Sequence, residues 1–536
     1  MPDTWTDFAI ALPTLVGLLF AFAFGACAGS FVHVVAWRVP EGMSVVSPPS
    51  RCPVCGYRLP WYDNIPVLGW LRLRGRCAAC HVAIPARYVL SEVAMGMLFA
   101  AIYAVLYMPR HGSFWWPVGQ GWWASIGLVA GLPALAAVLW AVGSLIAMLL
   151  CDARTFLIPV AIPTWSSVVA FVLWPVAGLV AAFGSAADHP GFPMPMPSWQ
   201  VSLAATGALA GLAIGRISLA AGVLPRSFAD YDDYLANEDD TFADYPHARR
   251  EMIKEIAFLG PAVLLGGIGA LVARTLHAPA EVPLALQAFF AAATGFVAAG
   301  ALVWIVRIAA TLLLGTEALG LGDVHLLAAA GAAFGWRAAV VGFFVAPFVG
   351  LAWWTVNLVR HAPMRMPFGP ALAIGSIVAW IGRPLLDGVV TGALHAMSGM
   401  ASAARQSPGG ALAMAGLMIA VSLVGAVLVR RGIAAGAALA ILAMVGAVVA
   451  WIFGAPGEHV WGVLMGLAIV ACCLLAGVLV QPSLEPDSGP RTVTARVLRL
   501  LAFLVVVLGA FVWTSGVGRQ SADSDGFPAD APLQAP

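Results

Sequence analysis

The chain has 536 residues, of which 61% are hydrophobic and only 10% charged, and its mean hydropathy is +0.92. Soluble domains carry roughly a quarter of charged residues, so this composition excludes an ordinary soluble globular protein. The net charge of +1 gives no bulk basic character, and we therefore expect no nucleic-acid partner.

Long apolar runs, separated by short polar breaks, follow one another along the chain. Many of them reach the ~20 residues that a helix needs to cross a bilayer. Because these runs do not alternate in polarity, they exclude a membrane barrel. We expect an all-α polytopic membrane protein with about 14 transmembrane helices in the lipid bilayer. The N-terminal sequence MPDTWTDFAIALPTL lacks a basic region and a cleavage site, so it reads as an uncleaved first span.

The expected spans can be taken in chain order. The first seven are expected at residues 9–30, 89–108, 125–150, 164–185, 201–223, 256–276 and 285–313. The chain then goes out and back over residues 324–359 and leaves again over 370–397. About four more apolar runs follow, by the same hydropathy criterion.

Arginines indicate which loops face the cytoplasm, since short cytoplasmic loops are enriched in Lys and Arg. The loop between the first two spans contains seven arginines, and we expect it to be cytoplasmic. The third and seventh spans then return to the same side, and lead to Asp152 and Asp323. A second polar island, residues 224–255, has nine acidic residues and is also expected on this side.

We expect three domains. Residues 1–110 contain the first span and a cytoplasmic cysteine-rich loop, and residues 111–400 form the membrane core. Within that core, an acidic loop and extra spans are expected to be inserted between about 186 and 284. Residues 401–536 form a C-terminal membrane extension without a recognisable motif, and its Ser/Asp/Pro-rich tail after Ser515 is expected to be disordered.

Four of the eight cysteines form two CxxC pairs in the loop after the first span. They are Cys52 and Cys55, then Cys77 and Cys80, with 21 residues between the pairs. Two such pairs at this separation can supply four thiolates to one tetrahedral zinc ion. Gly56 and Gly75 beside the pairs suit tight turns. The loop is too small to form a core of its own, so metal binding would supply much of its folding free energy.

Two disulfides are the alternative interpretation of these cysteines. Disulfides need an oxidising compartment, whereas the arginines place this loop in the reducing cytosol, which favours zinc. His81 directly follows Cys80 and could compete as a ligand. Four thiolates already complete a tetrahedral shell, so we expect His81 not to bind the metal.

Two acidic residues stand at the ends of apolar runs, where ionisable groups are costly and usually functional. Asp152 lies in LLCDARTFLIPV, and Asp323 lies in EALGLGDVHLL, a G-x-G-D element whose Gly320 and Gly322 permit close backbone approach. Two carboxylates brought together can share one proton and activate a water, as in aspartyl proteolysis. The alternative is that each aspartate caps a helix N-terminus at the interface. The glycines count against this for Asp323.

Five segments, in order, resemble the type IV prepilin peptidase family of G-x-G-D aspartyl proteases. They are GSFVHVVAWRVP; the double-CxxC loop with PARYVLSEV, in which Arg87, Tyr88 and Glu92 fit the pattern; DARTFLIP; EALGLGDVHLLAAAGAAFGW; and MPFGPALAIG. Together they extend over roughly the first three quarters of the chain. The resemblance gives Asp152 and Asp323 the catalytic roles.

The resemblance implies a bifunctional enzyme of the bacterial inner membrane. It implies cleavage of prepilin or pseudopilin leader peptides after a glycine at the cytoplasmic face, for type IV pili or type II secretion. It also implies methylation of the new N-terminus with S-adenosylmethionine, an activity associated with the zinc-bearing N-terminal region. The residues that would bind S-adenosylmethionine are not identified by any motif.

The chain departs from the family pattern at three positions. The family often has Asn or Asp where this chain has Val160, Lys where it has His325, and Asn near His33. None of these changes removes a catalytic carboxylate. Either histidine could alter the pH dependence, because His titrates near neutrality, but an ordinary polar residue at the interface is the favoured interpretation for both. The aspartates are also unusually distant, 323 − 152 = 171 positions apart.

Two other functions remain open at this point. A non-catalytic membrane scaffold or transporter subunit with a zinc module predicts no pairing of Asp152 and Asp323, and leaves the G-x-G-D and PFGP elements unexplained. A peptidase without methyl transfer is the second, since the resemblance alone supports the methylation.

Overall fold

The computed structural model describes residues 4–107, 121–183, 192–230, 234, 245–276, 279, 281–317, 319–359 and 367–383. The chain divides into two compact units, Met1–Val390 and Thr391–Pro536, and the described residues all lie in the first. The expected C-terminal spans, the tail and the basic turn with Arg360 and Arg365 lie outside the described residues.

The described residues form helices joined by loops, with no strand among them and two isolated bridges in the cysteine-rich loop. The helices are α1 (Thr4–Arg38), a short 3-10 turn (Trp61–Asp63), α2 (Leu68–Arg72), α3 (Arg87–Tyr107), α4 (Trp122–Thr155), α5 (Ala161–Phe183), α6 (Trp199–Ala220), α8 (Ala248–Thr275), α9 (Leu284–Leu314), α10 (Leu321–Phe334), α11 (Trp336–Val359) and α12 (Phe368–Ile381).

Eight helices within the described ranges are long and apolar enough to cross a bilayer. Helices α10 and α12 are apolar but have only 14 residues each. The prediction of an all-α, multi-pass membrane protein is thereby confirmed. The predicted total of about 14 spans also counts apolar runs outside the described residues, and it stays a prediction.

Each of the seven expected spans before Asp323 corresponds to one long helix. The largest differences in boundary are at the end of α1, which continues to Arg38, and at the start of α8, which begins at Ala248 and therefore contains the last residues of the acidic island. The expected out-and-back passage is the pair α10 and α11, separated by Gly335 with a φ of 85°. At this left-handed angle, glycine is the residue with least strain.

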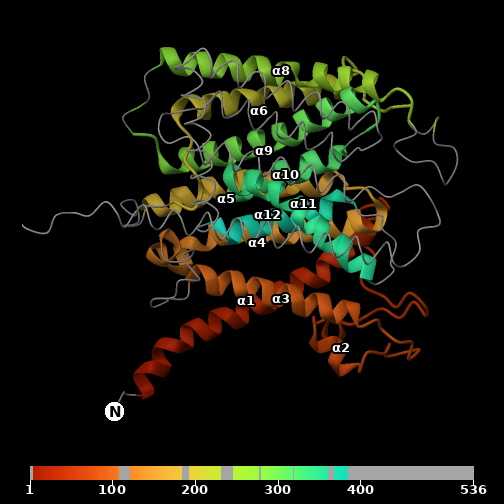
Figure 1. Ribbon diagram of the computed structural model, residues 1–536. Helices are drawn as coiled ribbons and strands as arrows, with labels where there is room; N and C mark the ends of the chain where they lie inside the picture. The colour runs from red at the N-terminus through yellow and green to blue at the C-terminus, as the bar shows by residue number, and fades with distance from the viewer. Residues whose placement is uncertain are drawn as a thin grey trace, which may run out of the picture. The chain divides into compact units, whose positions relative to one another are not determined.

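Helix α10 is the buried centre of this unit and packs against α4, α5, α9, α11 and α12 (Figure 1). Its sequence, Leu-Ala-Ala-Ala-Gly-Ala-Ala-Phe after His325 and Leu326, is almost entirely of small residues, and Leu326–Phe334 are all buried. Small side chains let helices approach closely in a membrane. At the tightest point, a side chain on Gly295 of α9 or Gly331 of α10 would collide with the other's backbone.

Helices α6 and α8 pack extensively on each other, and α6 also packs on α9 (Figure 1). Their contact again depends on close backbone approach, because a side chain at Gly207, Gly211 or Gly269 would collide with the facing helix. Both helices fall within residues 186–284, where the sequence predicts extra spans. That they form an insertion into a smaller core stays a prediction.

Candidate functional site

Asp152 lies in the last turn of α4 and is only 6% exposed. The helix ends at Phe156, whose left-handed backbone (φ 56°) lets its N–H bind the carbonyl of Asp152 at 2.9 Å. An aspartate at a helix C-terminus is not an N-cap, so the capping interpretation does not hold for Asp152. Its negative charge at this end is unfavourable with respect to the helix dipole and requires a compensating donor.

Asp323 is the third residue of α10 and is 7% exposed. Gly320 is the N-cap of the helix, and the N–H of Asp323 donates to the Gly320 carbonyl at 3.2 Å. Asp323 is therefore not the cap itself. A carboxylate in the first turn is favoured by the positive end of the helix dipole.

The structure brings the two aspartates to one end of the helix bundle. Ile158, in the loop after α4, packs against Gly322 and against Gly369 of α12: a Cβ built at Gly322 would lie 2.9 Å from its Cβ. Gly369 in turn contacts Asp152, so Ile158 and Gly369 connect the two segments that carry the aspartates. Two buried carboxylates on separate helices are thus neighbours although 171 positions separate them in sequence.

Asp152 is held by the first turn of α12. The N–H of Gly369 donates to its Oδ2 at 3.1 Å, and Pro367 is the N-cap of this helix. Helix N-termini present unpaired N–H groups and positive potential, so this contact supplies the donor that Asp152 needs. The Pro-Phe-Gly-Pro segment, residues 367–370, therefore places a helix N-terminus against one carboxylate.

A buried cluster of charges holds the turn before Asp323. Arg307 of α9 binds Glu317 at 2.5 Å and the carbonyl of Leu319, both in the connection from α9 to α10. The same guanidinium binds Glu255 of α8 at 2.9 Å, and Glu255 also accepts from Trp304 Nε1 at 2.7 Å. Arg307 is 1% exposed and Glu255 4%. We refer to Glu255, Arg307, Glu317 and the Leu319 carbonyl as the Arg307 cluster.

The four predicted zinc ligands come together in the loop after α1. The Sγ atoms of Cys52, Cys55, Cys77 and Cys80 all lie within 4.8 Å of one another, with 3.8 Å between Cys52 and Cys80 and 3.9 Å between Cys55 and Cys77. A tetrahedron of thiolates with Zn–S bonds of ~2.3 Å has sulfurs about 3.8 Å apart. No pair is a disulfide, since all four thiols are free. The cluster fits one tetrahedral metal.

The electrostatics of the cluster favour a cation. Backbone N–H groups of Cys80 and Ala79 lower the pKa of Cys77 to about 6. Although the backbone N–H of Val82 acts in the opposite direction, desolvation and the neighbouring thiols raise the pKa of Cys80 to about 12. Four negative sulfurs this close repel one another, so a bound cation is needed before all four can be thiolates.

The two CxxC turns have the same backbone pattern. In the first, Cys52 binds the carbonyl of Tyr57; in the second, Cys77 binds that of Val82, both at 2.9 Å. The residue after the second cysteine is left-handed in each turn, Gly56 with φ 71° and His81 with φ 57°. His81 thus occupies the place of a turn glycine and is not part of the metal-binding group.

The cysteine loop is anchored to α3 through Glu92. Val67 has φ 64° and ψ −54°, and Leu68 N–H binds the Pro66 carbonyl at 2.7 Å, which defines a γ-turn of the rare positive-φ type. Such a backbone is strained for a β-branched residue. The N–H of Val67 donates to Glu92 Oε2 at 2.8 Å. The carboxylate of Glu92 therefore stabilises an unfavourable turn.

Other residues singled out in the sequence have simple positions. His33 of α1 binds Ser91 Oγ at 2.5 Å and packs edge-on against Tyr88. His325 lies in α10, two residues after Asp323, and is half-buried. Arg154, two residues after Asp152, binds Glu41 at 2.7 Å and stacks on Trp37, so it ties the end of α4 to the end of α1.

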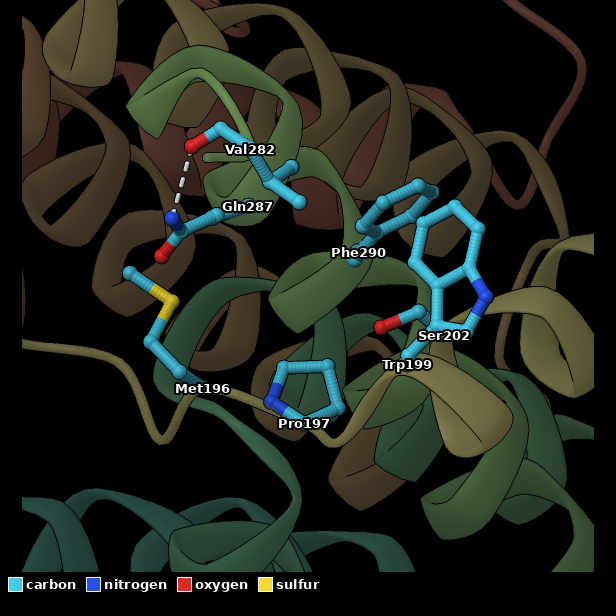
Figure 2. A pocket seen from close by; sticks show the side chains of 7 residues that line it. All are labelled: Met196, Pro197, Trp199, Ser202, Val282, Gln287 and Phe290. Atoms are coloured by element: carbon cyan, nitrogen blue, oxygen red, sulfur yellow. Dashed lines mark hydrogen bonds between the residues drawn. The ribbon is translucent and has the colours of Figure 1, made fainter. Parts of the chain in front are cut away.

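A cavity of about 230 Å³ lies at the other end of α9, between the segment before α6 and the start of α9 (Figure 2). Gln287 in its wall is satisfied by the carbonyl of Val282 at 2.7 Å. The cavity is remote from both aspartates, and neither lines it.

Sequence reasoning missed two parts of the site. In the sequence, only the PFGP segment points to the contact of Gly369 with Asp152, and the segment itself indicates no role. Arg307 had a clear signal, because an arginine within an otherwise apolar span is costly unless it is paired. Its partner Glu255 was grouped with the acidic island.

Comparisons with known proteins support the N-terminal assignment. Residues 23–106 match the family model of the bacterial peptidase A24 N-terminal domain. The prepilin leader peptidase/N-methyltransferase of Myxococcus xanthus (strain DK1622) is 53% identical over 94 residues, 17% of this chain and 28% of that protein. The proteins of the same name from Burkholderia pseudomallei (strain K96243) and Klebsiella pneumoniae are 35% identical over 153 residues and 43% identical over 99 residues.

These alignments cover 46% and 43% of the latter two relatives, so the chain spans less than half the length of the curated relatives it matches. No solved structure matches the chain. The matched residues contain the double-CxxC loop with His33, Arg87, Tyr88 and Glu92. The resemblance of this chain to the type IV prepilin peptidase family is thereby confirmed in its N-terminal region.

Proposed function

We propose that the chain is a prepilin peptidase, an aspartic endopeptidase that removes the leader peptides of type IV prepilins or pseudopilins. The observation that carries the proposal is the convergence of Asp152 and Asp323, both buried, at one end of the bundle. The similarity to named prepilin leader peptidases supports the substrate class.

The reaction follows from a pair of carboxylates that share one proton. The ionised carboxylate takes a proton from water, and the hydroxide oxygen attacks the scissile carbonyl carbon. The protonated carboxyl donates a hydrogen bond to the carbonyl oxygen. The C–N bond then breaks, and a proton passes to the leaving amine. The Gly369 N–H holds Asp152 in place for this step.

A prepilin is itself a membrane helix with a basic leader on the cytoplasmic side. Its scissile bond would lie at the depth of the two aspartates. The substrate helix must unwind there, because water attacks only an extended, accessible carbonyl. Glycine at the cut site makes unwinding easier, since it costs roughly 1 kcal/mol in a helix relative to alanine.

The proposed location is the bacterial inner membrane, with the site at the cytoplasmic face. Arg154, two residues after Asp152, pairs with Glu41 just after α1, so Asp152 lies near the end of α1. Helix α1 leads into the arginine-rich cysteine loop. A loop with seven arginines is retained on the cytoplasmic side. Both aspartates would therefore face the side that carries the leader.

We assign a structural zinc ion to Cys52, Cys55, Cys77 and Cys80, because their sulfur spacing fits tetrahedral thiolate coordination. The metal would fix the fold of the loop and take no part in the cleavage. N-methylation of the new amino terminus is proposed as a second activity, since the similar proteins carry both names. S-adenosylmethionine would supply the methyl group, and we assign no residues to its binding.

The test is mass spectrometry of a prepilin processed by the full chain in lipid vesicles, with and without S-adenosylmethionine. The proposal predicts cleavage after a glycine and, with the methyl donor, a gain of one methyl group on the new N-terminus. Cleavage without methylation would show that the chain is a peptidase without methyltransferase activity. No cleavage of any prepilin or pseudopilin would support the non-catalytic scaffold, which the convergence of the two aspartates already disfavours.

A further inference from the structure

The Arg307 cluster links α8 to the connection between α9 and α10, which directly precedes Asp323. We infer that Glu255 and Arg307 are positioning residues for Asp323, an inference that rests on the proposed peptidase function. Through these two residues, helix α8 sets the position of the Asp323 carboxylate.

The guanidinium of Arg307 bonds to two different parts of the chain. Arg307 binds Glu255 through Nε and Nη2, and Glu317 and the Leu319 carbonyl through Nη1. Glu317 and Leu319 lie six and four residues before Asp323. A rigid fork with several donors can fix two backbone segments at once, which a single-point cation cannot do. Glu317 and Leu319 are therefore both fastened to α9.

Arg307 is itself held in place by its neighbours. It is shielded from water, since it is only 1% exposed. Glu255 from α8 supplies the opposing carboxylate, and this carboxylate is itself oriented by Trp304 Nε1. Phe228, from the loop before α8, lies under the guanidinium at 5.5 Å. Removing one partner of such a pair leaves an uncompensated buried charge and changes the position of the other.

Helix α8 also holds the start of the α9–α10 connection, through a contact that does not involve Arg307. Near the end of α9, Arg249 of α8 binds the carbonyl of Leu312 at 2.9 Å and lies against Gly315. Helix α8 therefore holds the α9–α10 connection at two places, at its start through Arg249 and at Glu317 and Leu319 through Glu255 and Arg307. A displacement of α8 would be transmitted to Asp323.

The experiment measures kcat and KM for prepilin cleavage by the full chain in vesicles. Glu255→Ala and Arg307→Lys should each lower kcat about 100-fold with KM nearly unchanged, because a small misplacement of a catalytic group has this effect. Glu255→Gln keeps one oxygen that can accept from Trp304 Nε1 and Arg307 Nε but loses the acceptor for Arg307 Nη2, and should retain more of the rate than Glu255→Ala. The double variant should be no worse than Glu255→Ala alone.

Arg250→Gln is the matched control, since it removes a charge from an exposed position of the same helix, five residues before Glu255. It should leave kcat unchanged. A Glu255→Ala enzyme with the kcat of this control, or one whose loss lies wholly in KM, would overturn the inference.

A second readout does not depend on cleavage and covers variants that fold poorly or an inactive parent. Leu319→Cys is introduced, and its rate of maleimide labelling is followed by mass spectrometry of that peptide. If Glu255 fastens the turn, Glu255→Ala should accelerate labelling about tenfold, as local opening does. Equal labelling rates would overturn the positional role. An inactive parent with accelerated labelling would instead reject the proposed function and keep the fastening.

Discussion

The backbone N–H of Gly369 donates a hydrogen bond to Oδ2 of Asp152 across 217 positions of sequence. It joins the start of α12 to the end of α4, and both helices pack on α10, which carries Asp323. The carboxylate is thus oriented by a main-chain donor whose position depends on the packing of three helices. Substitutions that disturb this hydrogen bond should therefore change the rate of prepilin cleavage.

Gly369→Ala should lower the rate of prepilin cleavage about 100-fold, because the added methyl group displaces a catalytic group. A Cβ at this position would meet Asp152 Oδ2 and would lie 3.1 Å from Ile158 Cδ1. The carboxylate of Asp152 must therefore shift, which disturbs its hydrogen bond with the Gly369 N–H. The measurement is kcat on a purified prepilin.

Gly143→Ala is the control for this variant. It lies on the same helix as Asp152, and its Cβ would have only Met95 Cε as a neighbour, at 3.9 Å. Its rate should equal that of the parent. The account of Gly369 is wrong if both alanine variants cleave at the parent rate.

The metal cluster predicts different outcomes for neighbouring residues. Cys80→Ser should abolish metal binding, because it removes one of four ligands, whereas His81→Ala should keep about one zinc ion per chain. The loop without metal should become sensitive to proteases, since metal binding and folding are coupled. Elemental analysis and limited proteolysis of the purified protein are the measurements. Loss of zinc in His81→Ala with retention in Cys80→Ser would show a different ligand set.

The strained turn at Val67 predicts a coupling with Glu92. Glu92→Ala should lower the free energy of unfolding of the N-terminal region by about 2 kcal/mol, as expected for a hydrogen bond to a charged group. In a Val67→Gly background the same substitution should cost clearly less, because glycine tolerates the turn without support. Thermal unfolding of the four variants measures this coupling. Additive costs would mean that Glu92 does not hold the turn.

Much of this fold could be predicted from the sequence because a bilayer restricts the chain to few solutions. The hydropathy of the runs at 125–150 and 285–313 was sufficient to locate α4 and α9. The sequence predicts the sixth span from residue 256, led into by an amphipathic stretch, whereas α8 is one helix from Ala248, in which Glu251 and Glu255 are buried and paired with Lys254 and Arg307. Hydropathy cannot recognise a charge that is paired.

The candidate site could be predicted only in part. The four cysteines are close in sequence and have few ways to meet, so their cluster followed from spacing. Asp152 and Asp323 were found by their context, but their proximity depends on the packing of α4, α10 and α12. Gly369 has no side chain to attract attention. Its role lies in a backbone N–H, which only the tertiary structure reveals.

The central claim is that Asp152 and Asp323 act as one catalytic unit. The most direct measurement is the single-turnover rate of prepilin cleavage by Asp152→Asn, Asp323→Asn and the double variant, each with its zinc content and thermal unfolding recorded. Because a shared proton requires both carboxyls, each single variant should be as inactive as the double, with metal and stability retained. Cleavage at the parent rate by either single variant would contradict the pairing.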